Sequence, residues 1–413
     1  MEPLTEREAA TYRLERIRAV AAGILETAQV TFLLLIAHRW FHAGPAEKGM
    51  LQGASSAGLL LTPVLVTMAA ALGWNAERAA GRLFILGAAG LLATVLFPTL
   101  PVLVAGAGLG VLCTAATAPF LASIYSRNYH AGRRGDLFSR NIVVRIVASV
   151  LFAWLAGLWL EARPDGFRWI LGFYAAALAL NAWCVSRCPP VLLEQEDGRN
   201  PLRAFRYVRT DRVFRWTLIS WMLMGFGNLI MFPLRVEYLS NERYGLHLSP
   251  SEIALLTSVA PNAARLLFTR MWGRLFDRMN FFTLRIILNT GFMLGILSFF
   301  TGGGQAGLWA GAVLFGVSNA GADLAWSLWV TKVAPPNRVT DYMAVHTFLT
   351  GFRGVIAAFA AFQCAAWFGI GPTAAGAAGL ILLASLLLIR EKRRAPETPV
   401  AQDGSKASAS SSS

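Results

Sequence analysis

The stretch Trp-Gly-Arg-Leu-Phe-Asp-Arg-Met-Asn, residues 272–280, separates two long apolar runs at roughly 250–272 and 281–301. Gly273 would let the backbone turn or approach a neighbour closely. Asp277 can cap or charge-stabilise the start of the helix that follows. Three arginines would hold the segment at the level of the lipid head groups: Arg274, Arg278 and Arg285. The stretch therefore predicts a tight hairpin between two membrane-spanning helices.

The composition of the chain is that of a bilayer protein. Of its 413 residues, 55% are hydrophobic and only 15% are charged, whereas soluble domains carry about 25% charged residues. The charged segment 1–18 leads directly into an apolar run, which predicts an uncleaved first span. A net charge of +14 would suggest a nucleic-acid partner in a soluble protein. Here the basic residues gather in loops on one side, so we expect no nucleic-acid partner.

Apolar runs long enough to cross the hydrocarbon core, which takes about 20 residues, recur along the chain. Phe97-Pro98-Thr99-Leu100-Pro101 divides the third run from the fourth. The runs are continuous rather than alternating, which favours helices over transmembrane β-strands. We predict an all-α integral membrane protein with twelve transmembrane helices, near 17–38, 49–73, 82–100, 102–125, 138–161, 167–187, 214–237, 250–272, 281–301, 306–333, 341–367 and 371–390.

The basic residues predict the orientation of the chain. With twelve spans both termini lie on one side, and that side carries most of the 37 Lys and Arg residues. The positive-inside rule then places both termini in the cytoplasm, in a plasma (inner) membrane. The longest polar interval, 188–213, separates six spans from six. We predict an N-terminal six-helix bundle (1–188), a cytoplasmic linker (189–213), a C-terminal six-helix bundle (214–394) and a disordered cytoplasmic tail (395–413).

The hairpin resembles the Gly-x-Leu-x-Asp-Arg loop of the major facilitator superfamily at four positions: Gly273, Leu275, Asp277 and Arg278. Any basic loop between two membrane helices is the alternative explanation. Residues 73–82, with Glu77 and Arg78, look like a degenerate first copy, which supports a repeat of six spans. The resemblance covers nearly the whole chain and implies two pseudo-symmetric six-helix bundles. Signatures of drug antiporters and sugar porters are missing, so the subfamily is not identified.

Polar residues inside the apolar runs are the candidate functional positions, because burying them in a bilayer is costly. One set is expected along the pathway of substrate and protons: Glu26, Gln29, Asn228, Arg265, Asn319, Asp323 and Trp326. A second set is expected at the interface or gate between the halves: Asn141, Arg145, His346, Thr350 and Arg353. The resemblance implies that Glu26 and Asp323 face a central cavity from opposite halves, flanked by Arg145, Arg265 and Arg353.

Acids and arginines together suggest two tasks. Arginine keeps its charge and presents a planar fork to carboxylates or phosphates, and desolvation raises the proton affinity of a buried carboxyl group. We therefore predict a secondary transporter that moves a small, anionic organic solute by alternating access, coupled to protons as a symporter or antiporter. Alternatively, the charges pair with one another to lock helices. The rival functions are a non-transporting sensor or scaffold on the same fold and an integral-membrane enzyme.

Cofactor chemistry has no support in the sequence. The four cysteines lack zinc-ligand pairing, and His38 and His42, near Glu47, have no further identifiable ligands. There is no Walker-type nucleotide loop. We expect no catalytic residues, no metal and no cofactor. The expected partners are a small-molecule substrate and the lipid bilayer, with the protein a monomer.

Overall fold

The structure, a computed structural model, describes residues 4–193, 205–334 and 339–394, and its regular elements there are helical. The first half of the chain holds α1 (Glu6–Thr27), continued by the π-helical η1 (Ala28–Phe32) and by α2 (Leu33–Arg39), then α3 (Pro45–Ala71), α4 (Ala76–Leu96), α5 (Leu100–Ala116) with α6 (Ala118–Asn128), α7 (Ala131–Ala162) and α8 (Phe167–Ser186). Each predicted apolar run of this half lies on one of these helical segments.

The second half begins with the short α9 (Arg206–Thr210) and α10 (Arg212–Ser240). There follow α11 (Pro250–Ala254), continued by the π-helical η5 (Leu255–Val259) and by α12 (Ala260–Arg278), then α13 (Phe281–Thr301), α14 (Gly304–Val333), α15 (Val339–Phe368) and α16 (Ile370–Arg394). In the described residues, eleven segments are long and apolar enough to cross a membrane. The α11–η5–α12 segment is continuous but falls outside that group, because α12 carries several charged residues.

Helix ends follow local sequence signals. Pro45 and Pro101 occupy first-turn positions of α3 and α5, where the missing N–H is not needed. The side chain of Asp211 caps α10 by accepting from the Phe214 amide. Ser249 and Glu252 form a reciprocal capping box at the start of α11. The hairpin between the third and fourth predicted spans is therefore a turn between Leu96 and Leu100.

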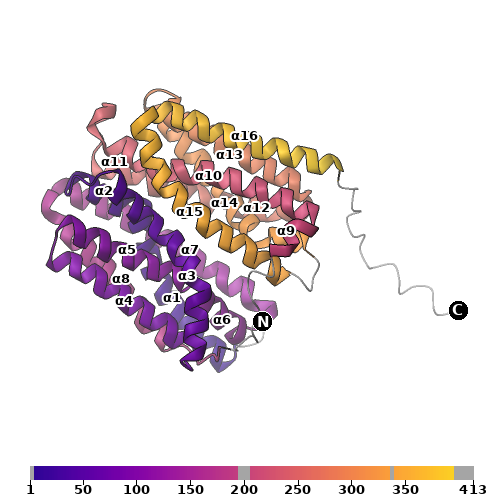
Figure 1. Ribbon diagram of the computed structural model, residues 1–413. Helices are drawn as coiled ribbons and strands as arrows, with labels where there is room; N and C mark the ends of the chain where they lie inside the picture. The colour runs from indigo at the N-terminus through magenta and orange to yellow at the C-terminus, as the bar shows by residue number, and fades with distance from the viewer. Residues whose placement is uncertain (1–3, 194–204, 335–338, 395–413) are drawn as a thin grey trace.

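The helices of each half pack mainly among themselves. In the first half α1 packs on α7 and α8, and α4 on α5 and α8. In the second half α10 packs on α16, α12 on α14, and α13 on both α14 and α16. The halves meet where α3 packs on α15 and α7 on α11 (Figure 1).

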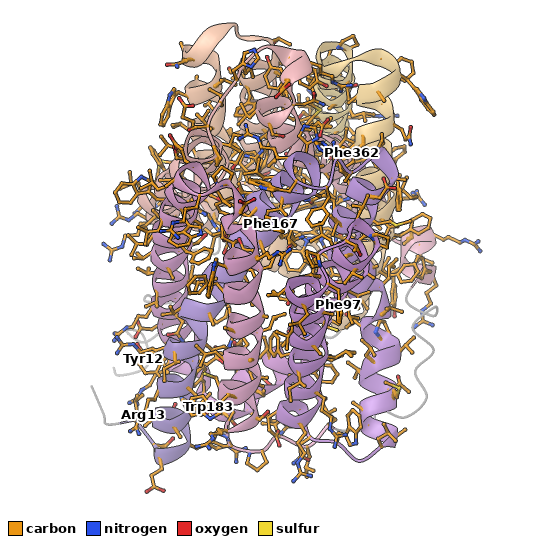
Figure 2. The ribbon with its side chains drawn as sticks, turned by 90° about the vertical axis from the view of Figure 1, so that its left-hand side faces the viewer. Tyr12, Arg13, Phe97, Phe167, Trp183 and Phe362 are labelled. Atoms are coloured by element: carbon orange, nitrogen blue, oxygen red, sulfur yellow. The ribbon has the colours of Figure 1, made fainter. Side chains whose placement is uncertain are left out.

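The two ends of the molecule differ. Figure 1 shows α2 and α11 together at one end, which we call the far side, and α6 and α9 toward the other, which we call the terminal side. Figure 2 shows Tyr12 and Arg13 of α1 and Trp183 of α8 grouped toward one end. Trp183 is 45% exposed, and Arg187 lies 4.9 Å over its ring. Such exposed aromatic and basic pairs are typical of a membrane interface.

The hairpin predicted at 272–280 is present between α12 and α13, but its turn is shorter than expected. α12 runs through Gly273, Leu275, Asp277 and Arg278, and the turn is confined to Met279 and Asn280. Gly273 has helical neighbours and open space where a Cβ would stand, so it neither turns the chain nor allows a close approach. Asn280, not Asp277, caps α13 by accepting from the Phe282 amide. The side chain of Asp277 lies outside the described residues.

The first copy of the loop does turn. Gly73 has a φ of +63°, the left-handed region that favours glycine. Glu77 is buried in the first turn of α4, where its Oε2 accepts a hydrogen bond of 3.1 Å from the Val191 amide. Arg78 is exposed, as are Arg278 and Arg274 in the second copy. Glu77 thus ties the start of α4 to the chain that follows α8.

Candidate functional site

Four charged side chains from four helices meet within the spans, and we call them the central network: Glu26 of α1, Arg145 of α7, Arg265 of α12 and Asp323 of α14. Arg265 joins the two acids. Its Nε and Nη2 lie 2.7 and 2.6 Å from Oδ2 of Asp323, and its Nη1 lies 3.0 Å from Oε1 of Glu26. Arg145 adds an ion pair of 3.2 Å from its Nε to Oε2 of Glu26. The formal charges balance, and the network crosses from one half to the other.

Two π-helical turns lie beside this network. Glu26 stands just before η1, and Arg265 follows η5 on the continuous helix that leads into α12. The two turns touch across the halves, because Oγ1 of Thr31 lies 2.7 Å from Oγ1 of Thr257 and 3.0 Å from Oγ of Ser258. A π turn inserts one residue into a helix and is frequent at functional sites. Here the paired turns bring α1 and α12 close enough for Glu26 and Arg265 to bond.

The network is open on one side. The side chain of Asp323 is 50% exposed, although it points at Arg265 between the halves, while Glu26 and Arg265 are 20% and 12% exposed. Trp326, one turn further toward the terminal side on α14, is 36% exposed. The open face of α14 therefore leads from the network toward the terminal side.

The far side is closed by contacts between the halves. Nζ of Lys48 lies 2.6 Å from Oε2 of Glu237, and both side chains are less than a tenth exposed. Nη2 of Arg39 donates to the Leu248 carbonyl at 2.5 Å. His38, considered above as a metal ligand, instead has Nδ1 3.0 Å from the Lys48 ammonium. We call Lys48 and Glu237 the far-side pair.

Three of the predicted pathway residues stand apart from the network. The side chain of Gln29 lines a separate cavity of about 80 Å³ within the first half, with Ser55 and Thr114. The amide oxygen of Asn228 is buried and has no hydrogen-bond partner in the described residues. Asn319 is half-buried on α14, one turn before Asp323.

The predicted interface residues divide into two groups. Asn141 is buried one turn before Arg145, and Ser149, further along α7, accepts a hydrogen bond of 3.3 Å from Asn262 of α12. His346, Thr350 and Arg353 form the expected polar stripe on α15, but the structure does not bring Arg353 to the acids. Its Nη1 donates to the Trp221 carbonyl at 2.7 Å instead.

The position predicted for Arg285 is wrong. It was expected at the lipid head groups, but it is 1% exposed, and its guanidinium carbon lies 3.6 Å from the centroid of Trp221. Trp221 and Trp329 lie in the same region, with ring centroids 5.8 Å apart. An arginine inside an apolar run was itself the available signal.

A family model described as Major Facilitator Superfamily matches residues 19–358. The chain belongs to this superfamily. It is accordingly a secondary transporter, an integral membrane protein of multiple spans that binds small-molecule substrates within the membrane, and it is not an enzyme. The arrangement of twelve helices in two six-helix bundles is the one typical of the superfamily.

Solved structures of superfamily transporters resemble the chain over nearly its whole length. The nucleoside transporter NupG superposes with a TM-score of 0.74 at 14% identity, covering 94% of this chain and 100% of that one. The D-xylose-proton symporter gives 0.70 at 16% identity, with 93% and 97% covered. The human organic anion transporter MFSD10 gives 0.62 at 14% identity, with 94% and 100% covered. No curated protein sequence matches the chain. At these identities the likeness shows the fold alone.

Proposed function

We propose that this superfamily member moves a small anionic organic solute in exchange for, or together with, protons. The observation that carries the proposal is the bridge that Arg265 makes between Glu26 of one half and Asp323 of the other. These ion pairs exist only while the carboxylates are charged. A proton on Asp323 would remove that ion pair and free Arg265, so protonation and the joining of the halves are linked.

An anionic cargo fits the same geometry. Arg265 and Arg145 both offer forked donors to a carboxylate or phosphate. When Asp323 or Glu26 takes up a proton, a solute carboxylate or phosphate can replace it on the arginine. MFSD10 is an organic anion transporter, whereas NupG is a nucleoside transporter and the third structure is a D-xylose-proton symporter, so the choice of an anion depends on the arginines.

The proposal includes an orientation with the terminal side in the cytoplasm of a plasma (inner) membrane. Exposed basic residues gather at the ends of helices on that side, which the positive-inside rule favours: Arg13, Arg16, Arg393 and Arg394. In this orientation the open face of α14 leads to the cytoplasm and the far-side pair closes the opposite entrance.

Proteoliposome transport tests the proton coupling. Organic acids that raise the melting temperature of the purified protein would be offered as labelled substrates, with and without a pH gradient. We expect a pH gradient to drive accumulation in the wild type. Asp323→Asn and Glu26→Gln should lose gradient-driven accumulation but keep exchange of labelled for unlabelled solute, because exchange needs no net proton movement.

Asp136→Asn is the matched control. Asp136 is also 50% exposed and also pairs with an arginine, Arg140, but lies outside the network. It should behave as the wild type. Unchanged pH dependence in both Asp323→Asn and Glu26→Gln would refute the coupling proposal.

A further inference from the structure

A second group of cationic side chains lies within the last six helices, away from the central network. Arg285 of α13 is 1% exposed, and its Nη1 and Nη2 have no hydrogen-bond partner in the described residues. Its guanidinium carbon lies 3.6 Å from the centroid of the Trp221 ring. A cation–π contact compensates only part of the cost of burying a guanidinium.

Arg353 of α15 adds a second guanidinium to this group, and His346 of the same helix lies beside Trp221. Arg353 is bonded to the Trp221 carbonyl through Nη1, while its buried Nε has no partner in the described residues. Its guanidinium lies flat on Gly225, where a Cβ would collide with it. His346 is fully buried with both ring nitrogens unbonded there, and its ring centroid lies 5.1 Å from that of Trp329.

Unsatisfied donors dominate this group. The indole nitrogens of Trp221 and Trp329 are also buried without a partner in the described residues, and indole and guanidinium groups can only donate. Neither Arg285 nor Arg353 takes part in any ion pair given for the described residues. Buried polar groups in native proteins are nearly always satisfied. The group therefore has an excess of positive charge and N–H donors, and what it lacks is an acceptor with negative charge.

We propose that these residues form a binding site for one oxyanion group, a carboxylate or a phosphate, and that this group belongs to the transported solute. The site, here named the basic-aromatic site, comprises Trp221, Arg285, Trp329, His346 and Arg353. It rests on the proposed anionic cargo and gives that cargo a second oxyanion-binding position besides Arg265 and Arg145. Arg285 and Arg353 both contact Trp221, and the guanidinium fork of each suits an oxyanion.

The basic-aromatic site lies next to the open face of α14. The ring of Trp326 is 5.9 Å from that of His346 and 36% exposed, and Trp326 follows Asp323 by three residues. The hydroxyl group of Thr350, one turn from both His346 and Arg353, is buried and unbonded in the described residues. A solute can thus enter along α14 past Trp326, with its anionic group bound at the arginines and its body near Asp323.

Thermal-shift titration of the purified full chain tests the site. The probes are inorganic phosphate and benzoate, with benzamide as the neutral analogue of benzoate and KCl at matched ionic strength. We expect a saturable rise in melting temperature with phosphate or benzoate and none with benzamide or KCl. Arg285→Met should weaken the anion's apparent affinity at least about tenfold, as loss of one charge-assisted hydrogen bond does.

Two further variants separate binding from folding. Gly225→Ala keeps every charge but displaces Arg353, and it should also weaken anion binding. Arg235→Met is the matched control, because Arg235 is likewise buried, with one unbonded Nη and its guanidinium 3.8 Å over Phe315, but lies outside the site. It should leave the anion response unchanged. Arg285→Met alone, without ligand, should not lower the melting temperature, since removing an unpaired buried charge removes a cost.

Several results would refute the proposal that the basic-aromatic site binds an oxyanion of the solute. One is the absence of any phosphate or benzoate effect on the wild type up to 50 mM; another is an effect that Arg285→Met and Arg235→Met reduce equally. A shift caused by phosphatidylglycerol in maltoside micelles, but by neither free anion, would assign the oxyanion to a lipid and refute the cargo. Proton-driven uptake that is unchanged in Arg285→Met would refute this site but not the proposed function. Anion binding at this site without any proton-driven uptake would refute the proposed function but not the site.

Discussion

Arg265 and Arg285 both lie inside spans, but their neighbours differ in charge. Arg265 is bonded to Asp323 and Glu26, whereas Arg285 faces the ring of Trp221 and has Arg353 and His346 nearby. A balanced ion-pair network can join the halves and be opened by a proton. A site with surplus positive charge suits an incoming anion. The same residue type thus serves two functions in the proposal, and the difference is set by the partners.

The strength of the Arg265–Asp323 bond can be measured with a double-mutant cycle of Arg265→Met and Asp323→Asn. We expect a coupling free energy of about 1 kcal/mol or more, because the bond is charge-assisted and Arg265 is largely buried, although exposure of Asp323 limits it. Denaturant unfolding in mixed micelles gives the four free energies of unfolding. The exposed pair Asp136–Arg140 is the control and should couple by about 0.5 kcal/mol or less. Equal coupling in the two pairs would contradict a special role for Arg265.

The sequence predicted the members of the network but not all of their contacts. Glu26, Arg145, Arg265 and Asp323 could be selected because ionisable residues are costly inside apolar runs. Their pairing depends on helix rotation, which the π-helical turns η1 and η5 alter and which no local sequence pattern specifies. Arg285 was misplaced for a related reason: it lies close to a helix end, and its depth in the bundle is decided by neighbouring helices.

At the scale of elements, the boundaries of the helices and the hairpin within 272–280 were largely predictable, but the exact position of its turn was not. Length, apolarity and the prolines locate the spans. Glycine and clustered charges at 272–280 favoured a turn, yet at a membrane edge water and head groups can solvate the charged side chains while the backbone stays helical. α12 therefore continues to Arg278, and Asn280 begins α13.

Two glycine substitutions test whether the chain is helical at Gly273 and closely packed at Gly316. Gly273→Ala should raise the free energy of unfolding by about 0.5–1 kcal/mol, because Gly273 is helical with open space around it. Gly316→Ala should lower it by about 1–3 kcal/mol, because a Cβ there would collide with the backbone of Pro261 and separate α14 from α12. Melting temperatures of both variants provide the measurement. A destabilised Gly273→Ala would favour the turn at Gly273 that the sequence predicted.

At the scale of the whole molecule, the two halves are held together on one side of the network and open on the other. The far-side pair and the Arg39 bond to the Leu248 carbonyl join them at the end where α2 and α11 lie, while Asp323 and Trp326 are exposed toward the terminal side. Alternating access requires a second state in which this asymmetry is reversed. The buried far-side pair should then be a main contribution to the free-energy difference between the two states.

Breaking that pair should shift the population of states. In Lys48→Met the carboxylate of Glu237 loses its cation, which penalises the closed far side but not a state in which Glu237 meets water. Ser258→Cys, buried at η5 between the far side and Arg265, reports opening through its reaction with an impermeant maleimide added outside intact cells. We expect Lys48→Met to raise that labelling rate about tenfold, which corresponds to about 1.4 kcal/mol.

The controls for this experiment also test the proposed orientation. Glu242→Cys, exposed on the far side, should label in every background, and Arg78→Cys, exposed on the terminal side, in none. Background from native thiols should be low once Cys364 is replaced, since the other three cysteines are buried and burial raises the pKa of Cys188 to about 12. Labelling of Arg78→Cys but not of Glu242→Cys would reverse the orientation. An unchanged Ser258→Cys rate in Lys48→Met would mean that contacts other than the far-side pair, such as the packing of α3 on α15, keep the far side closed.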